Sequence, residues 1–455
     1  MTIRLPPSFS TKLKEGTVAI MSARPFTTAP NQTVPSKGST SPPKDCRMVQ
    51  LTVCPNGEPV QICSPFKIIS RDRFGLEGPE CAIRSRIVGH SRCINHCVAR
   101  CVCDVRQGTA VTLHTLDPLS DDRWDNLVAR HARASVFHQR GWLQALDRTY
   151  GYKPFVLTSA PPGEPLQDGM VLCRASSWIT GTRIVSLPFS DHCEPLLDDA
   201  SEPWEFMNFL RVQCDRHRWK YVEIRSSCAE QGAGYALPNS ISHWFHELDI
   251  TPSLEQLFTQ LHSSCFQRKI HKAERERLSY EAGRSEQIVS AFYRLLVATR
   301  KRHGLPPQPQ QWFEHLVDCM GDNIQIRLAR KDGVPIAAVL TLQHRSSVAY
   351  KYACSDARFH NLGGMPFLIW QLIGESKASG AQRIDFGRSD LDNHGLISFK
   401  DRLGAIRSPL IYQRYGSGKE SNASMRWKPL RRWSFSKLPN TALSFAGRIM
   451  YRHIG

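Results

Sequence analysis

Two carboxylates and a lysine near the carboxyl-terminal end are residue types that can take up a proton and stabilise a negatively charged oxygen. Asp385 and Asp390 lie at the end of the expected strand QRIDFGRS and just beyond it, where the ligand sites of α/β sheets collect. The turn residues Asn393-His394-Gly395 predict a chain reversal that returns Lys400 to this strand end. We therefore assign Lys400, Asp385 and Asp390 as candidate catalytic residues, with the lysine facing an oxyanion or a phosphate. The alternative is that ISFKDRLG forms a surface helix with a solvated lysine.

Neighbouring side chains supply candidate substrate contacts. Phe399 would form an apolar wall that excludes water, and Arg388 lies between the two carboxylates in the sequence. Tyr350 and Tyr352 flank Lys351 on an expected strand, whose period of two sends both rings to one side. Their hydroxyls would orient a sugar or a peptide there, unless the rings only pack against the sheet.

Basic residues elsewhere suit a substrate that carries phosphate. Arg268, Lys272 and Arg275 share one face of an expected helix, where they would bind a diphosphate. A solvated basic face explains the same pattern equally well. Arg225 follows Glu223 at the analogous place in the first half, as a substrate contact or as part of a structural Glu–Arg pair.

The signatures of several enzyme classes are missing. The sequence contains no G-x-S-x-G elbow, no Walker A loop, no dinucleotide-binding G-x-G-x-x-G and no H-E-x-x-H helix. The formal charge of +18 divides into +8 for residues 1–108, +3 for 109–418 and +7 for 419–455. Because the charge of residues 109–418 is nearly balanced, an RNA-binding function is disfavoured. An RNA-binding protein would have to use the basic ends of this chain. Enzymes that work by positioning and electrostatics remain, and these require no metal.

Residues 1–108 differ from the rest in composition. They are rich in Pro, Ser, Thr and Gly and later in Arg and Cys, and they show no sustained period. The spacing of CINHCVARCVC matches neither a zinc ribbon nor an iron–sulfur pattern. We interpret the segment as a disordered extension, or as one that is not translated because synthesis starts near Val105 or Val111 at a non-Met codon.

From Thr109 onward the order strand, strand, helix, strand occurs twice, ending at VEIRSS and at IDFGRS. This repetition predicts an α/β architecture with a structural duplication. We expect a first lobe at 109–240, a second lobe at 241–418 and a basic tail at 419–455.

Several segments, in this order, resemble the Fem-type transferases and their BioF2-like acetyltransferase relatives over about residues 112 to 415: HQRGWLQALDRTYGYKPF, SLPFSDHCEPLL, YVEIRSS, FQRKIHKAERERL, ATRKRHGLPPQPQQWF, YKYACSD, RIDFGRSD and LISFKDRLGA. The piece TRKRHGLPPQP is similar to the subgroup associated with exopolysaccharide and exosortase loci. The resemblance implies tandem GNAT-like folds with a central cleft, and an EC 2.3 activity. It also implies a substrate-cleft Phe-Lys dipeptide, here Phe399-Lys400. The long helical arm that some members insert for tRNA contact is not obvious in this sequence.

The same resemblance implies a donor-binding loop. GNAT acyltransferases hold the donor pyrophosphate with an R/Q-x-x-G-x-G/A loop at a helix N-terminus. The matching residues are Arg358, Asn361, Gly363 and Gly364, with Asn361 in place of the first glycine. A glycine-rich helix entry without a ligand is the alternative. The donor would be acyl-CoA or aminoacyl-tRNA, used as a co-substrate and not as a bound cofactor, and tRNA is expected only in that role.

Together these features predict an N-acyltransferase or aminoacyltransferase that acts on an amine of a nucleotide- or lipid-linked peptidoglycan or exopolysaccharide precursor. The alternative is a non-catalytic scaffold of envelope polysaccharide assembly. Because the sequence shows neither a membrane-spanning apolar run nor a secretory h-region, we expect a cytoplasmic protein. The tail alternates basic residues with the aromatic and aliphatic residues Trp427, Trp433, Phe435, Leu443, Phe445, Ile449 and Tyr451. This pattern predicts contact with an anionic membrane surface, unless the tail forms a helix packed on the second lobe.

Overall fold

The chain divides into two compact units, Met1–Val102 and Cys103–Gly455. The computed structural model describes residues 17–20, 49–52, 112–179, 181–197, 202–226, 240–416 and 435–454. In the first unit, strands β1 (Thr17–Ile20) and β2 (Val49–Thr52) pair in antiparallel register. The other predictions for residues 1–108, including the one for the cysteine cluster, lie outside the described residues.

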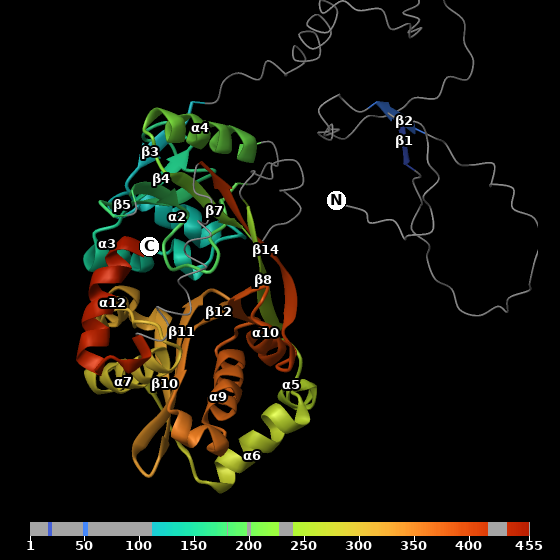
Figure 1. Cartoon of the computed structure of the whole chain (residues 1–455), viewed down its shortest axis with the longest axis vertical. Coiled ribbons are helices and arrows are strands. Elements are labelled where there is room, and N and C mark those ends of the chain that lie inside the picture. Colours follow the sequence, from blue (N-terminus) through green and yellow to red (C-terminus); the bar gives the residue numbers. More distant parts are fainter. Residues whose placement is uncertain are drawn as a thin grey trace, which may run out of the picture. The chain divides into compact units, whose positions relative to one another are not determined.

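One twelve-stranded sheet runs through the second unit (Figure 1), in the order β3-β4-β5-β6-β7-β14-β8-β13-β12-β11-β10-β9. The strands are β3 (His114–Leu116), β4 (Lys153–Thr158), β5 (Met170–Ser177), β6 (Gly181–Val185), β7 (Tyr221–Ser226), β8 (Ile241–Asp249), β9 (Ser279–Gly283), β10 (Ile324–Lys331), β11 (Val334–His344), β12 (Ser347–Ser355), β13 (Arg383–Asp390) and β14 (Ile406–Tyr415).

Helices cover both faces of the sheet. The α-helices are α2 (Asp122–Arg130), α3 (Arg140–Tyr150), α4 (Glu202–Arg216), α5 (Leu254–Gln260), α6 (Arg268–Arg275), α7 (Glu286–Arg302), α8 (Gln310–Met320), α9 (Gly364–Ala378), α10 (His394–Asp401) and α12 (Asn440–Ile454). Short helices of other types are η1 (Val136–His138), η2 (Ser263–Gln267), η3 (Gly321–Asn323) and η4 (Ala357–Leu362). Among the helices that the structure describes, none combines the length and the apolar character needed to cross a membrane.

The predicted duplication is visible in the order of elements. The series β4-β5-β6-α4-β7 is repeated by β10-β11-β12-α9-β13, and β6–β7 and β12–β13 are the parallel pairs. The linking strands cross over: β8 follows the first series but pairs with β13, whereas β14 follows the second series and pairs with both β7 and β8. The sequence did not predict β8, β9, β14 or α8. In β14, Pro409 and mostly part-exposed residues weaken the alternation that marks a strand.

The two halves share a hydrophobic core on one face of the sheet. Trp142 and Leu143 of α3 are fully buried there. The rings of Trp142 and Trp312 meet edge to face with centroids 5.2 Å apart, which joins α3 to α8 of the second half. On the opposite face, α4 covers the first half and α9 covers the second. A tight turn at Asp332-Gly333 connects β10 to β11, with φ positive at both residues.

Candidate functional site

The two parallel strand pairs separate after a short contact. Residues 347–349 of β12 pair with 383–385 of β13, and residues 183–185 of β6 pair with 221–223 of β7. Beyond Asp385, β13 continues against β8, while β12 continues against β11. The sheet therefore opens at the carboxyl ends of these strands, where polar side chains of α/β folds gather.

Helix α10 brings a lysine back to the end of β13. Asn393 caps the helix, because its Oδ1 accepts a hydrogen bond from Leu396 N at 3.2 Å. Lys400 Nζ then donates to the carbonyl oxygens of Gly387 and Arg388, each at 3.0 Å. The side chain is 4% exposed, so Lys400 is not the solvated lysine of the surface-helix alternative.

The surroundings of Lys400 lower the pKa of its ammonium group. Burial, with help from the nearby charges of Lys351 and Arg388, lowers the pKa of Lys400 to about 8, against the opposing effect of Asp191 and Asp385. The ammonium form thus prevails at neutral pH, and it gives up a proton more readily than a free lysine does. Such a group can both stabilise an oxyanion and donate a proton.

A loop of the first half, residues 186–192, supplies the partners of this strand end. Asp191 Oδ2 lies 2.7 Å from Lys351 Nζ, and His192 Nε2 lies 3.0 Å from Asp385 Oδ2. Two ion pairs across the halves therefore converge beside Lys400.

The charged forms of Asp191 and His192 are both favoured. Burial opposes ionisation of Asp191, but the charge and hydrogen bond of Lys351, together with the charges of Arg388 and Lys400, outweigh it, so the pKa of Asp191 is lowered. Burial also opposes protonation of His192, yet the hydrogen bond with Asp385 raises the pKa of the imidazole. His192 is accordingly a better proton acceptor than a free histidine.

Gly387 is the backbone position around which these groups converge. Its φ is +66°, and a Cβ there would lie 2.9 Å from Asp191 Oδ2, so only glycine fits. Its N–H donates to Asp385 Oδ1 at 2.6 Å, and its carbonyl accepts from Lys400. The carboxylates of Asp191 and Asp385 and the ammonium of Lys400 thus meet around one residue, Gly387.

The 186–192 loop has a strained backbone that Arg225 supports. Leu187 and Phe189 have φ of 61° and 64°, a region that bulky residues rarely enter. Arg225 Nη1 donates to the carbonyls of Leu187 at 3.0 Å and Ser190 at 2.8 Å. Its Nε also lies 3.0 Å from Glu223 Oε1, as in the structural pair that the sequence left open. In this arrangement Arg225 holds the loop in place.

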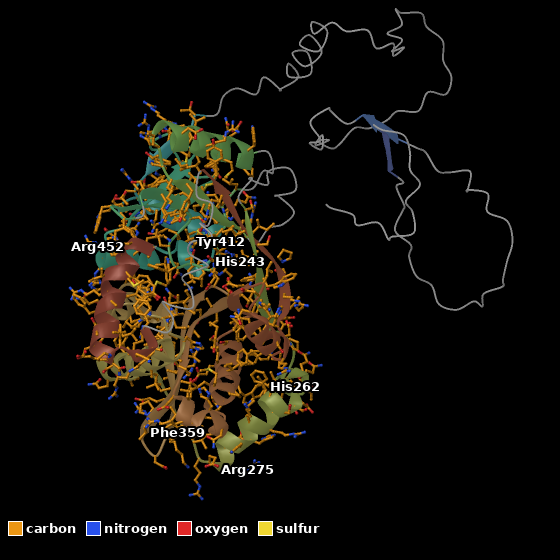
Figure 2. All side chains as sticks on the ribbon, in the orientation of Figure 1. His243, His262, Arg275, Phe359, Tyr412 and Arg452 are labelled. Atoms are coloured by element: carbon orange, nitrogen blue, oxygen red, sulfur yellow. The ribbon has the colours of Figure 1, made fainter. Side chains whose placement is uncertain are left out.

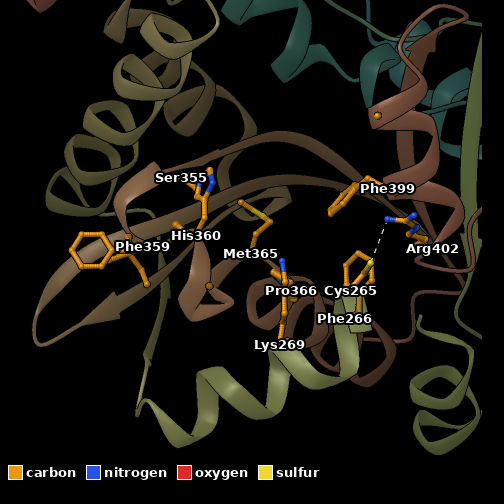
Figure 3. Close-up of a pocket in the computed structure, with 14 residues that line it drawn as sticks. Cys265, Phe266, Lys269, Ser355, Phe359, His360, Met365, Pro366, Phe399 and Arg402 are labelled. Carbon is orange, nitrogen blue, oxygen red and sulfur yellow. Dashed lines mark hydrogen bonds between the residues drawn. The ribbon is translucent and has the colours of Figure 1, made fainter. Parts of the chain in front are cut away.

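A cavity of about 480 Å³ lies where α6, α10 and the beginning of α9 meet (Figure 3). Phe266 and Phe399 form an apolar wall, with ring centroids 5.3 Å apart. Lys269 and Arg402 add positive charge, and Arg402 Nη1 lies 3.4 Å from the thiol of Cys265. Apolar walls and positive charges next to a helix N-terminus suit an acyl donor that carries phosphate.

A second cavity, of about 170 Å³, lies between the two halves. His192 and Glu194 come from the first half, and Glu247, Arg383 and Asp385 from the second. Burial raises the pKa of Glu247, whose Oε2 lies 3.9 Å from Arg383 Nε. Carboxylates and an imidazole suit a ligand with an amine. Among the described residues, no cluster of three or more His, Cys, Asp or Glu side chains has the arrangement of a metal site.

The two cavities lie on opposite faces of β13. Ile384 and Phe386 pack in the core beneath α9, the helix at whose start the larger cavity lies. Side chains alternate along a strand, so Arg383 and Asp385 point to the other face and line the smaller cavity. Lys400 lines neither cavity; its helix α10 contributes Phe399 to the larger one, and β13 contributes Arg383 and Asp385 to the smaller one.

Part of the predicted donor loop lines the larger cavity. Gly363 is the left-handed N-cap of α9, with φ of 81°, and a Cβ there would collide with the backbone carbonyl of Lys269. Gly364 begins the helix and lines the cavity. Arg358 instead pairs with an aspartate of its own loop at 2.7 Å, and Asn361 is exposed.

The prediction that Tyr350 and Tyr352 lie on one side of their strand is wrong. Thr341 pairs with Tyr350 and Leu340 with Tyr352, so Lys351 is the extra residue of a β-bulge. A bulge breaks the alternation of side chains and often re-aims one of them. Here it turns Lys351 toward the 186–192 loop.

The two tyrosines consequently reach opposite faces of the sheet. Tyr350 lies under α9, where its hydroxyl donates to the sulfur of Met365 at 3.2 Å. The hydroxyl of Tyr352 accepts from Trp312 Nε1 at 3.0 Å within the shared core. Tyr352 thus has the packing role that the sequence left as its alternative.

Helix α6 is the predicted diphosphate-binding helix, but none of the three residues predicted to bind phosphate lines the larger cavity. Arg268 and Arg275 are exposed and Lys272 is half-buried on α6, whereas Lys269 lines the cavity. Figure 2 shows Arg275 at the margin of the molecule. The exposed residues form a basic surface beside the cavity.

Two arginines, one from each half, face the same tyrosine. Arg225 and Arg388 have guanidinium carbons 4.9 and 5.3 Å from the ring centre of Tyr412, which lies centrally in the sheet beside His243 (Figure 2). Asp390 lies farther out, 3.1 Å from His243 Nδ1 and 3.7 Å from Arg388 Nη2. Four of the predicted site residues therefore lie near the end of β13: Lys400, Asp385, Arg388 and Arg225. Asp390 lies farther out.

Sequence reasoning did not single out Asp191, His192, Lys351 or Lys269. The first two lie in SLPFSDHCEPLL, whose adjacent Asp and His between prolines were the available signal. Their approach to β13 depends on the strained loop, which no local pattern predicts.

Comparison with protein families supports the second half most directly. Residues 264–395 match the model described as "Acetyltransferase (GNAT) domain". That span contains the larger cavity's α6 and α9 and the strand that carries Asp385. No curated protein shows significant sequence similarity to this chain.

Among solved structures, FemX superposes with a TM-score of 0.52 at 12% identity, covering 70% of this chain and all of FemX. The C-terminal domain of a putative lysylphosphatidylglycerol synthetase from Agrobacterium fabrum gives a TM-score of 0.45 at 14% identity, covering 69% and 96% of the two chains. A tandem GNAT protein from the clavulanic acid biosynthesis pathway gives 0.42 at 12% identity, covering 68% and 99%. The GNAT domain match and the likeness to FemX show the predicted mixed α/β, GNAT-like fold.

Proposed function

We propose that this chain transfers an acyl or aminoacyl group to an amine of a peptidoglycan or exopolysaccharide precursor. The observation that supports this most is the buried ammonium of Lys400 near the Asp385–His192 pair, which lines the smaller cavity, while Phe399 of the same helix lines the larger one. The likeness of TRKRHGLPPQP to the exopolysaccharide-associated subgroup favours the second kind of precursor.

The larger cavity suits the donor. Lys269, Arg402 and the N-terminus of α9 would attract donor phosphates, and Phe266 and Phe399 would hold the acyl part away from water. Acyl-CoA and aminoacyl-tRNA both present this combination. The exposed basic face of α6 supports either one. Because both donors are cytoplasmic compounds, the proposed reaction belongs on the cytoplasmic side of the membrane.

The smaller cavity suits the acceptor amine. Glu247 and Asp385 would attract it, and His192 would take a proton as the nitrogen bonds to the acyl carbonyl carbon. Lys400 would stabilise the oxyanion of the tetrahedral intermediate. Collapse of that intermediate breaks the bond to the thiol sulfur of CoA or to the ribose oxygen of tRNA, and the leaving group takes up a proton.

A transfer assay tests this proposal. The full chain is incubated with nucleotide-linked and lipid-linked amino sugars or peptides and with a panel of labelled acyl-CoA and aminoacyl-tRNA donors. We expect an amide product with one donor class, formed at least about a hundredfold more slowly by Lys400→Ala. Binding of an acceptor without product from any donor would overturn the proposal in favour of the scaffold alternative.

A further inference from the structure

Helix α12 is fixed to both halves through one face only. Leu443 is fully buried, and Gly447 lies so close to the carbonyl of Pro307 that a Cβ would collide with it. The hydroxyl of Tyr152 donates to the carbonyl of Tyr451 at 3.0 Å, and the rings of Tyr451 and Phe189 have centroids 5.8 Å apart. Leu443 and Tyr451, which the sequence counted among the membrane contacts, therefore face the protein.

The opposite face of α12 combines exposed apolar and basic side chains. Phe445, Arg448, Ile449 and Arg452 follow the spacing i, i+3, i+4, i+7, which places them on one face. Phe445 is 63% and Ile449 47% exposed. Figure 2 shows Arg452 at the margin of the molecule. The sequence contains no Asp or Glu from residue 435 to the end.

The turn after β5 extends this face. Trp178 is 90% and Ile179 58% exposed, the first being the most exposed of the large apolar side chains described. Ser177 Oγ lies 3.0 Å from His453 Nδ1, and the rings of Trp178 and His453 have centroids 6.3 Å apart. The turn is thus anchored beside the end of α12. We call Trp178, Ile179, Phe445, Arg448, Ile449 and Arg452 the outer tail surface.

We propose that the outer tail surface binds an anionic lipid membrane. Tryptophan and phenylalanine partition into the interface between headgroups and acyl chains, and arginines beside them pair with lipid phosphates. Residues 170–183 and 435–455 include no acidic residue, so the surface complements a negatively charged one. A protein partner would more often be met by mixed charges at the rim of such a patch. This surface lies outside the two cavities, and its role does not depend on the proposed transfer reaction.

Vesicle co-sedimentation of the full chain tests the inference. We expect the protein to pellet with vesicles of equal parts phosphatidylglycerol and phosphatidylcholine, and not with phosphatidylcholine alone. Added salt should reduce binding. Trp178→Ser, and Phe445→Ser combined with Ile449→Ser, should each weaken binding about tenfold or more, because each removes apolar area that enters the interface. Arg448→Gln with Arg452→Gln should reduce the preference for anionic vesicles.

A matched control is Ile406→Ser, because Ile406 is 74% exposed on β14 and lies outside the outer tail surface. It should bind vesicles as the parent does. All these variants keep residues 417–434, so the basic residues of that segment contribute equally throughout. Equal pelleting of the Trp178 and Phe445/Ile449 variants with the parent would overturn the inference. So would a dimer that forms without vesicles and dissociates in those variants, since it would identify a second copy as the partner.

Discussion

The two halves of the sheet share a topology but use the opening between their parallel strands differently. In the first half, the chain after β6 crosses back over the opening: Ser186 N donates to the carbonyl of Glu223, and Cys193 N to that of Arg225, each at 2.8 Å. In the second half, η4 leads directly from β12 to α9, and the 480 Å³ cavity remains at the start of that helix.

This difference shows that the two copies of a repeated fold can have different roles. The first half closes its own opening with the 186–192 loop, and the loop carries Asp191 and His192 to the second half. The second half retains the cavity and provides Lys351, Asp385 and Lys400. The first half therefore contributes side chains to the site of the second half, although the elements of both halves follow the same order.

The largest expected effect separates the two arginines that face Tyr412. Arg225→Met should lower the free energy of unfolding by about 3 kcal/mol, because two loop carbonyls lose a charged donor, while Glu223 retains its ion pair with Arg414. Arg388→Met should change stability little, since Arg388 is partly exposed, and should raise KM instead. Chemical denaturation and steady-state kinetics measure the two effects. Equal loss of stability in both variants would mean that the halves do not differ in this way.

Lys400→Ala should lower turnover about a hundredfold or more, roughly 3 kcal/mol, through loss of a transition-state contact. Lys400→Arg should recover little, because a planar guanidinium does not fit between the two carbonyls. The sequence alone predicts a thermal midpoint within a degree or two of the parent. With two buried acceptors left unpaired, we expect a stability loss of about 1–3 kcal/mol. Exposed Lys153, paired with Asp147, provides the control Lys153→Ala. Near-parental turnover of Lys400→Ala would place the reaction elsewhere.

His192→Gln should lower turnover by roughly a hundredfold at most, because another base or water can accept the amine proton less efficiently. Its distinguishing result is the pH profile: the parent should lose activity on the acidic side as His192 becomes protonated, and the variant should not. His217→Gln, which alters a histidine stacked on Trp219 away from the site, serves as control. An unchanged acidic limb in His192→Gln would assign the base to another residue.

The basic limb of the pH profile should report Lys400. If the ammonium form is required, activity falls about tenfold per unit as pH rises above about 8. Stability should move the other way. The folded pKa lies below the usual 10.5, so the unfolded state binds more protons between these values and the contribution of this group to stability increases with pH. Lys400→Met should abolish both trends in activity assays and in denaturation at several pH values.

The smallest effect is expected from the first unit. A chain that starts at Gly108 should match the full chain in thermal midpoint and solubility, because residues 1–108 have the composition of a segment that buries little surface. Calorimetry measures the midpoint. A fall of more than a few degrees would show that the segment stabilises the rest.

Local patterns predicted the repeated elements and the return of Lys400 to β13. Asn393 and Gly395 signal that turn within a few residues, and the apolar face of α3 is visible as Trp142, Leu143 and Leu146. These features depend on residues that are close in the sequence, so they can be predicted without knowledge of the fold.

The remaining features depend on distant partners. The bulge at Lys351 follows from pairing with β11, and it reverses the expected side of Tyr352. Likewise, His192 becomes important only because a strained loop places it against Asp385. Neither has a local signal, because the stabilising contact lies more than a hundred residues away for His192 and on another strand for Lys351.

The crossing of β8 and β14 has a consequence for synthesis. On its β14 side, β7 has no neighbour until residues 406–415 have been made, because β14 lies between β7 and β8. At about 5–20 residues per second, a ribosome needs roughly 10–35 seconds to pass from β7 to β14. During that interval the nascent chain carries an open strand edge, which invites pairing with other chains. The first half is synthesised first, but its part of the sheet is completed last, when β14 pairs with β7. We therefore expect the first half to be the part of the nascent chain that most needs a chaperone.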